Sequence, residues 1–197
     1  MTTTAVAAPP IRAPRQIQAL ASGIRQDIVD ALESNGPSSL RELGALLGLR
    51  PDALYYHVRV LREAGLVIDG GAERADPSAP AIIDLAIRPS QLRYAPADRR
   101  NRESVCAVVA SMTRSAERRF RRAFRPGRSV VEGPHRDLWA GRCQGWLADE
   151  DLEQVNAHLA AILEIIRARQ KPSNENAKRR ELTFVLVPLA DRRSGGA

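Results

Sequence analysis

The chain has 197 residues, of which 44% are hydrophobic and 4% aromatic, and it carries a formal net charge of +7. This length can hold one or two domains with cores of their own, and the composition is typical of soluble globular proteins. No run approaches the roughly eighteen apolar residues that a membrane span needs, and the N-terminal residues lack the charged start and apolar core of a signal peptide. We therefore expect a cytoplasmic protein that has no membrane partner.

Cysteine and histidine positions argue against a metal centre. Cys106 and Cys143 show no CxxC spacing, and His57, His135 and His158 show no metal-ligand spacing with them or with each other. We expect two buried free thiols, no disulfide, no metal and no cofactor. The sequence also lacks a Gly-rich phosphate loop and a Gly-x-Ser-x-Gly nucleophile elbow, so we do not expect an enzyme.

The first predicted element follows a disordered lead over residues 1–14. Residues 22–36 predict a helix, because they carry an apolar face at helical spacing that consists of Ile24, Ile28, Val29 and Leu32. An Asn-Gly-Pro run that starts at residue 35 ends this helix.

A helix-turn-helix pattern comes next. Ser39 followed by Glu42 is a capping box that begins a short helix, and Gly48 stands where a helix takes its left-handed C-terminal residue. Pro51 then opens a second helix at its first position, where the missing N–H costs nothing. Two helices joined by a Gly-containing turn predict a helix-turn-helix, whose second helix enters the major groove of DNA.

The second helix carries two tyrosines outside its apolar face. At about 100° per residue, Leu54, Val58 and Leu61 fall on one narrow arc. Tyr56 falls on the opposite side and Tyr55 at the border, so the core arc is filled without them. We interpret both tyrosines as DNA-reading residues, and burial in the core is the alternative.

Two apolar runs around a turn-rich segment predict a β-hairpin after the second helix. The runs cover residues 66–68 and 81–87, and glycine and proline are frequent in the segment between them. Such a hairpin is the wing of a winged helix. We therefore predict a winged helix-turn-helix domain over residues 15–95.

The stretch LGLRPDALYYHVRVLREAGLV resembles the recognition helix and first wing strand of the arsenic-repressor-like (ArsR-type) winged helix-turn-helix transcriptional regulators. The resemblance covers roughly residues 15–88. In two places the chain departs from the family: Arg50 stands at the N-cap, where a small hydroxyl residue is usual, and residues 40–45 lack the cysteine of the metal sensors. The resemblance implies a regulator of transcription, by family habit a repressor, that does not sense metal. It also implies that the region after the wing serves dimerisation and in some relatives holds a small-molecule effector, which no residue here identifies.

The candidate DNA-binding residues lie at the start of the first helix, along the second helix and at the wing tip: Ser39, Arg50, Asp52, Ala53, Tyr55, Tyr56, Arg59, Arg62 and Arg74. Net charge gives this domain little support, because residues 1–95 hold ten arginines and ten acidic residues. The case for double-stranded DNA as the partner therefore depends on the motif. A winged-helix protein–protein interaction module without specific DNA binding is the alternative.

The positive charge lies in a predicted helix over residues 99–124. Residues 98–128 hold ten arginines and three acidic residues. An apolar stripe at helical spacing runs along the same helix and predicts a homodimer interface made by Val105, Val108, Val109, Met112, Ala116 and Phe120. The alternative is that the helix over residues 149–170 covers this stripe within one chain. Arg119 lies near the stripe, and if buried it needs a carboxylate partner.

The region 96–197 is predicted to be a dimerisation or effector module with the order helix, strand, helix, strand. Its strands are expected at residues 138–147 and 182–189, where apolar residues run together. The fold class is therefore mainly α with a small β part (α+β). We expect a homodimer that binds a two-fold operator through helix 51–64 and the wing at 66–87, because two recognition helices about one DNA turn apart discriminate better than one.

Overall fold

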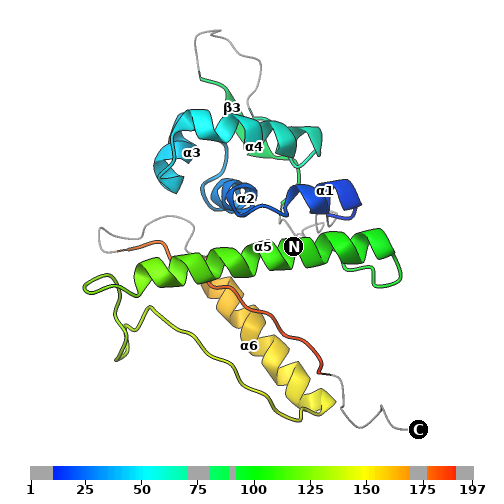
Figure 1. Cartoon of the computed structure of the whole chain (residues 1–197), viewed down its shortest axis with the longest axis vertical. Helices are drawn as coiled ribbons and strands as arrows, with labels where there is room; N and C mark the ends of the chain where they lie inside the picture. Colours follow the sequence, from blue (N-terminus) through cyan, green and yellow to red (C-terminus); the bar gives the residue numbers. More distant parts are fainter. Residues whose placement is uncertain (1–10, 71–79, 89–91, 169–176, 190–197) are drawn as a thin grey trace, which may run out of the picture.

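The computed structural model describes residues 11–70, 80–88, 92–168 and 177–189. Within them, an N-terminal winged-helix domain lies on one side of a long helix, and a second helix lies on the other side (Figure 1). The helices of the domain are α1 (Pro14–Ala19), α2 (Gly23–Asn35), α3 (Leu40–Leu47) and α4 (Pro51–Glu63). The helices that follow are α5 (Arg99–Ala123) and α6 (Asp149–Arg167).

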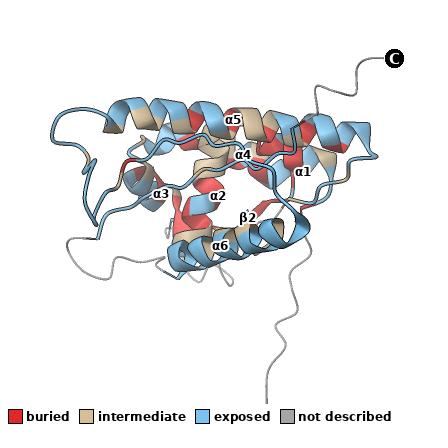
Figure 2. Ribbon diagram, turned by 90° about the horizontal axis from the view of Figure 1, so that it is seen from below, coloured by how far each residue is buried: buried red, intermediate tan, exposed pale blue. Residues whose placement is uncertain are grey.

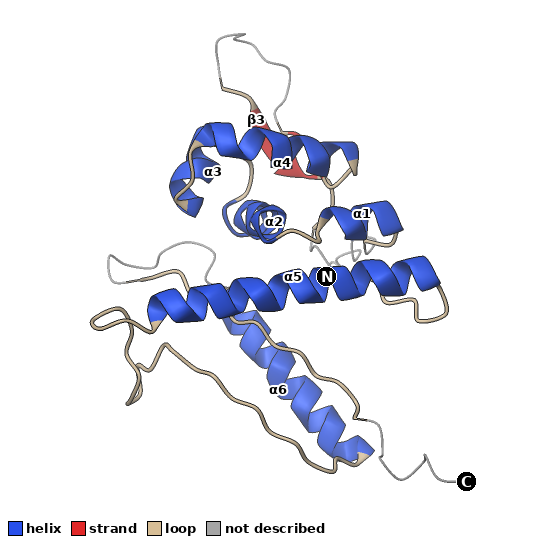
Figure 3. Cartoon of the chain, in the orientation of Figure 1, coloured by secondary structure: helices blue, strands red, loops and turns tan. Residues whose placement is uncertain are grey.

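A small antiparallel sheet completes the domain. Its strands are β1 (Ser38–Ser39), β2 (Val67–Asp69) and β3 (Ile82–Leu85), in the order β1-β3-β2. Val67 stands opposite Leu85 and Asp69 opposite Ile83, which is the register of a hairpin. The mixed fold class and the winged helix are therefore confirmed (Figure 3).

The local signals in the sequence account for the helix boundaries. The Ser39 hydroxyl accepts from the Glu42 N–H at 3.2 Å, and the Glu42 carboxylate accepts from the Ser39 N–H at 2.7 Å, so the capping box is formed. Gly48 ends α3 with φ at 67°, a left-handed conformation that favours glycine. Pro51 is the first residue of α4, and Arg50 before it makes no side-chain cap.

The domain begins earlier than the sequence predicts. Ile11, which we assigned to a disordered lead, is buried and forms a parallel bridge with Leu92. The Arg93 N–H donates to the Ile11 carbonyl at 3.0 Å. The reason is tertiary, because the partner of this residue is distant in the sequence.

The long helix α5 packs on α1 and α2 through small and polar side chains together with Val105 and Val108 from one end of its apolar stripe. Its buried residues are Asn101, Ser104, Val108, Ser111 and Ser115. Asn101 donates to the Arg93 carbonyl at 3.0 Å and accepts from the Ala95 N–H at 2.8 Å. At Gly23 the two helices approach so closely that an added Cβ would overlap the Ser115 hydroxyl. Polar groups on this face thus take part in the docking of α5.

The expected strands at 138–147 and 182–189 are wrong. The chain is extended there, but no described residue gives either segment a ladder of hydrogen bonds. Helix α6 also has no buried residue, and Figure 2 shows it without the red that marks buried positions. An apolar run favours a strand, but only a neighbouring strand makes it one.

Arg119 joins the two parts of the chain. Its guanidinium forms ion pairs with Asp27 on α2 and with Glu181 in the C-terminal extended segment. The sequence required a carboxylate partner only for a buried Arg119; the side chain is 42% exposed and is paired all the same. A further ion pair between Arg180 and Asp137 links the starts of the two extended segments.

None of the helices in the described part of the chain is long and apolar enough to cross a membrane.

Candidate nucleic-acid interface

Helix α4 is fixed in the domain by one face and presents the other to solvent. Leu54, Val58 and Leu61 are buried, as the helical phase predicts. Tyr55 and Tyr56 are 63% and 57% exposed, so the interpretation that they lie outside the core is confirmed. The packing of α4 thus leaves an aromatic and basic surface free for a partner.

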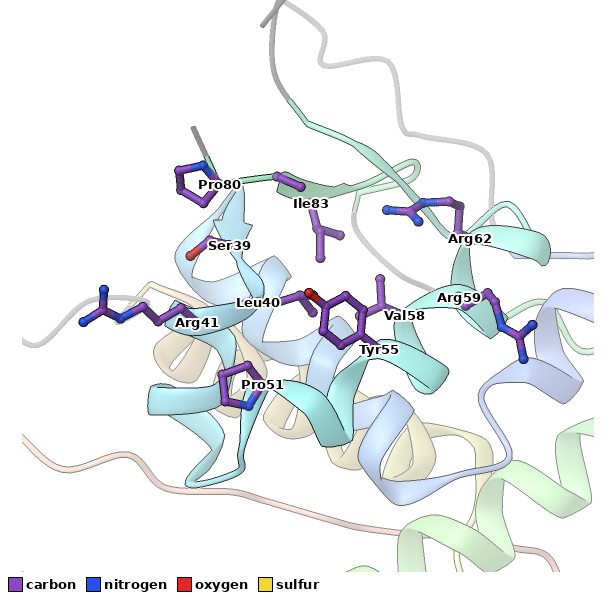
Figure 4. A pocket seen from close by; sticks show the side chains of 11 residues that line it. Ser39, Leu40, Arg41, Pro51, Tyr55, Val58, Arg59, Arg62, Pro80 and Ile83 are labelled. Atoms are coloured by element: carbon purple, nitrogen blue, oxygen red, sulfur yellow. The ribbon is translucent and has the colours of Figure 1, made fainter. Parts of the chain in front are cut away.

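An open groove of about 550 Å³ lies where α3, α4 and β3 meet (Figure 4). Its lining combines apolar side chains with three arginines and one tyrosine: Ser39, Leu40, Arg41, Pro51, Tyr55, Val58, Arg59, Arg62, Pro80, Ala81 and Ile83. The two tyrosines differ in their position relative to the groove. Tyr55 lines it, whereas Tyr56 does not and instead makes an edge contact with His57 and lies 5.6 Å from the Arg59 guanidinium.

The arginines of this surface are held by neighbouring acids. Arg50 pairs with Asp52 at 3.3 Å, Arg59 with Glu63 at 3.9 Å, and Arg62 with Asp69 at 2.7 Å. All three pairs are exposed, and such pairs contribute about 0–1 kcal/mol. A phosphate can therefore displace the carboxylates at little cost, and a planar guanidinium suits phosphate oxygens.

Arg41 is a candidate contact that the sequence analysis missed. It is exposed on α3, lines the groove, and makes no ion pair within the described residues. Of the three groove arginines it is the only one without a carboxylate partner in the part of the chain described. Its place in the first turn of α3, next to the capping box, was the signal that could have identified it.

Of the other predicted contacts, Ser39 also lines the groove but is engaged in the helix cap. Ser39 is buried, and its hydroxyl donates to the Glu42 carboxylate at 2.8 Å and accepts from the Glu42 N–H, so it serves the helix cap. The Ser39 N–H and hydroxyl together lower the pKa of Glu42. Ala53 and Asp52 are exposed on α4 but do not line the groove. Arg74 lies outside the described residues.

His57 lies on α4 between its exposed face and its buried face. Its Nδ1 is buried and has no hydrogen-bond partner in the described structure. Burial, and secondarily the charge of Arg25, lower the pKa of His57 below its ordinary value of 6.5. The side chain is therefore neutral at physiological pH and adds no charge to the surface.

The predicted dimer stripe on α5 is divided by the fold. Val108 is 7% exposed and packs into the core of its own winged-helix domain, so it is not available to a second chain. The other members of the stripe are half-buried: Val105, Val109, Met112, Ala116 and Phe120. Phe120 stacks on the exposed Phe124, with ring centroids 5.7 Å apart.

The thiols and metal ligands are not gathered into a site. Cys106 and Cys143 are free but exposed, which corrects the expectation that they are buried; both stand on surfaces that no described part of the chain covers. Among the described residues, no three His, Cys, Asp or Glu side chains lie close enough to hold a metal ion.

A family model described as a helix-turn-helix domain matches residues 20–69, which comprise α2, β1, α3, α4 and β2. The comparison with curated proteins found no match. The chain thus carries a helix-turn-helix domain of the kind found in DNA-binding transcription regulators.

Proposed function

We propose that this protein is an ArsR-like transcriptional repressor that binds a two-fold DNA operator as a homodimer. The observation that carries the proposal is the exposed face of α4, where Tyr55, Arg59 and Arg62 border a groove that the base of the wing closes on one side. A helix presented in this way fits a major groove, with the tyrosines and arginines directed at base edges and phosphates. Dimerisation uses the region after the wing.

Salt dependence of DNA binding tests the proposal. A protein that neutralises several phosphates loses affinity steeply with salt, with a slope of log K against log salt of about −0.9 per phosphate. We expect a slope of roughly −4 or steeper for the full chain on random duplex DNA, measured by fluorescence anisotropy. If log K changes little with log salt even in the low-salt range, the protein is instead a protein-interaction module.

That second function has one observation in its favour. The arginines at Arg50, Arg59 and Arg62 are each neutralised by an acid, so the winged helix has no strong positive field. Sequencing of DNA fragments selected by the purified protein separates the two functions further. An enriched palindromic motif supports the operator, and an unenriched pool supports a protein partner. A non-catalytic role is part of the proposal in both cases.

A further inference from the structure

The region after α5 has no core of its own. We call residues 129–168 and 177–189 the C-terminal arm. Among its described residues only Leu138 is buried, and Trp146 is 91% exposed. Burial this small does not offset the conformational entropy that an ordered segment loses. The apolar side chains of the arm therefore require a cover that one chain does not supply.

The backbone of the second extended segment, 182–189, is also without partners in the described structure. Within the described structure, the amides of 182–187 donate to no acceptor. Leu182, Phe184 and Leu186 alternate with Val185 and Val187, so both faces of this segment are apolar, as in a strand that is covered on both sides. A segment with free N–H and C=O groups and apolar faces is a template for another strand.

The two extended segments start beside each other. Asp137 and Arg180 hold their starts together, and both segments then run in the same direction in Figure 1. The Val130 N–H and the Arg180 guanidinium keep the pKa of Asp137 below its usual value, so this ion pair extends to more acidic pH. The segments nevertheless exchange no hydrogen bond with each other in the described structure.

The charges of the chain indicate the partner. Asp149, Glu150 and Asp151 begin α6, are exposed, and form no ion pair within the described residues. The arginines at and after the end of α5 are likewise exposed and unpaired there: Arg122, Arg125 and Arg128. The two groups lie at opposite sides of the molecule in Figure 1, so a two-fold axis can bring the acidic group of one copy to the basic group of another.

We propose that a second copy of this chain covers the C-terminal arm. The extended segments of the two copies, 138–147 and 182–189, form one shared β-sheet backed by both α6 helices. The acidic start of each α6 faces the basic end of the other copy's α5. This specifies how the homodimer proposed above is built, and its test uses no DNA, so its failure is distinct from a failure to bind an operator.

Hydrogen exchange and mass measurement on the full chain test the shared sheet. We expect a particle of twice 21.6 kDa by light scattering, and protection of about 100-fold or more at the amides of 182–187. A monomer overturns the proposal. So does a dimer in which these amides exchange at the rate of an unstructured peptide.

A matched pair of substitutions tests the same contact. Val185 in the arm and Ile68 on β2 are 49% and 48% exposed, so in a single chain both tolerate a charge about equally. We expect Val185→Asp to give a monomer whose arm amides lose protection, and Ile68→Asp to remain a dimer. If Val185→Asp stays dimeric with a protected arm, the proposal fails.

Charge reversal tests the same contact at exposed residues outside the core of the winged helix. One variant carries Asp149→Arg and Glu150→Arg and keeps Asp151, which accepts from the Ala148 N–H at the start of α6. The other carries Arg122→Glu and Arg125→Glu. Each alone brings like charges together in its dimer, and we expect self-association to weaken about tenfold or more by sedimentation. An equal mixture pairs opposite charges at both contacts, and we expect it to restore the dimer. A mixture no tighter than the separate variants would overturn the proposal.

Discussion

Tyr55 and Tyr56 show how far a helical phase can resolve single residues. The phase placed both outside the core, and their exposure agrees with it. The phase did not distinguish their environments, because the groove that Tyr55 lines is made partly by β3 and α3. The ring contacts that Tyr56 makes with described residues are with His57 and Arg59, both on its own helix.

We expect Tyr55→Ala and Tyr56→Ala each to weaken specific DNA binding, by about 1–3 kcal/mol for a side chain that contacts a base. Both side chains are exposed, so thermal stability should change by no more than about 0.5 kcal/mol. Anisotropy titrations and melting curves measure the two effects. Tyr94→Ala is the control, since Tyr94 is exposed but lies beyond the wing. A lowered melting temperature with unchanged affinity would place the tyrosine in the core.

Arg41 belongs to the same surface and carries an unneutralised charge. Because a phosphate contact is independent of sequence, we expect Arg41→Ala to lower affinity for specific and random duplexes alike. The slope of log K against log salt should become shallower by about one unit. Arg99→Ala, which removes an exposed arginine of α5 that is paired with Glu103, should leave the slope unchanged. Equal slopes for both variants would exclude a contact at Arg41.

His57 makes stability depend on pH. Its pKa is lowered in the folded state, so above pH 6.5 the side chain is neutral in both states and contributes no pH dependence. As the pH falls below 6.5, the unfolded chain takes up a proton that the folded chain does not, and the free energy of unfolding should fall. We expect His57→Gln to flatten this loss between pH 6.5 and the folded pKa in urea titrations.

A second group, Asp30, also makes the stability depend on pH, and its contribution cancels when the His57→Gln variant is compared with the unsubstituted protein. Loss of hydration around its carboxyl, together with the charges of Asp27 and Glu33, raises the pKa of Asp30 to about 6, although Asp30 is at the accessible side of α2. A raised carboxyl pKa gives stability that is present at low pH and lost as the pH rises through that value. This trend has the opposite sign to that of His57 and is common to both proteins, so it cancels in their difference. Identical pH profiles would show that His57 is not responsible.

At the scale of elements, prediction succeeded where the signal is local. Three such signals lie within four residues of the helix end that they determine: the capping box at Ser39, the left-handed Gly48, and Pro51. The segments 138–147 and 182–189 failed for the opposite reason, since a strand is defined by a neighbour that sequence spacing does not name. The docking face of α5 was not predicted, because apolar periodicity does not mark serine or asparagine, whereas the fold uses them as small side chains in a close helix contact.

Gly44 offers a test of the turn between α3 and α4. Helix propensity favours alanine over glycine by about 1 kcal/mol. An added Cβ at Gly44, however, would lie 2.7 Å from the Leu49 carbonyl oxygen, which is backbone and cannot turn away. We expect Gly44→Ala to destabilise the protein by about 1–3 kcal/mol in urea unfolding. Ala45→Gly at the exposed neighbouring position should cost about 1 kcal/mol through propensity alone. A stabilised Gly44→Ala protein would contradict the close packing of this turn.

At the scale of the whole molecule, α5 separates two kinds of contact. Its Ser and Asn face, with Val108, holds the winged helix, and the rest of its apolar stripe is half-buried beside that face. The predicted interface residues therefore have different roles, although the sequence places them on one stripe. Val108 and Val105 pack in the core of their own domain, whereas Met112 is half-buried outside that core.

Val108→Asp and Met112→Asp should therefore behave differently. A charge at buried Val108 has no partner and should cost several kcal/mol of stability. At Met112, which lies outside that core, we expect a folded winged helix and a small change in melting temperature. If the stripe adds to the interface formed by the arm, sedimentation velocity should show weaker self-association. The pair thus compares domain stability with dimer stability on one helix. Loss of folding in both variants would assign the whole stripe to the core of a single chain.

The docking of α5 determines what spacing of operator half-sites the protein can accept. The helix is about 38 Å long at 1.5 Å per residue and packs directly on α1 and α2, where Ser115 meets Gly23 and the Val108 carbonyl accepts from Gln26. In a dimer joined beyond this helix, the two α4 helices are therefore kept at a fixed distance and rotation. One added base pair between the half-sites turns the second site by roughly a tenth of a helical turn, which a rigid connection does not absorb. Under the proposed function, the protein would select operators by the distance between their half-sites as well as by their bases.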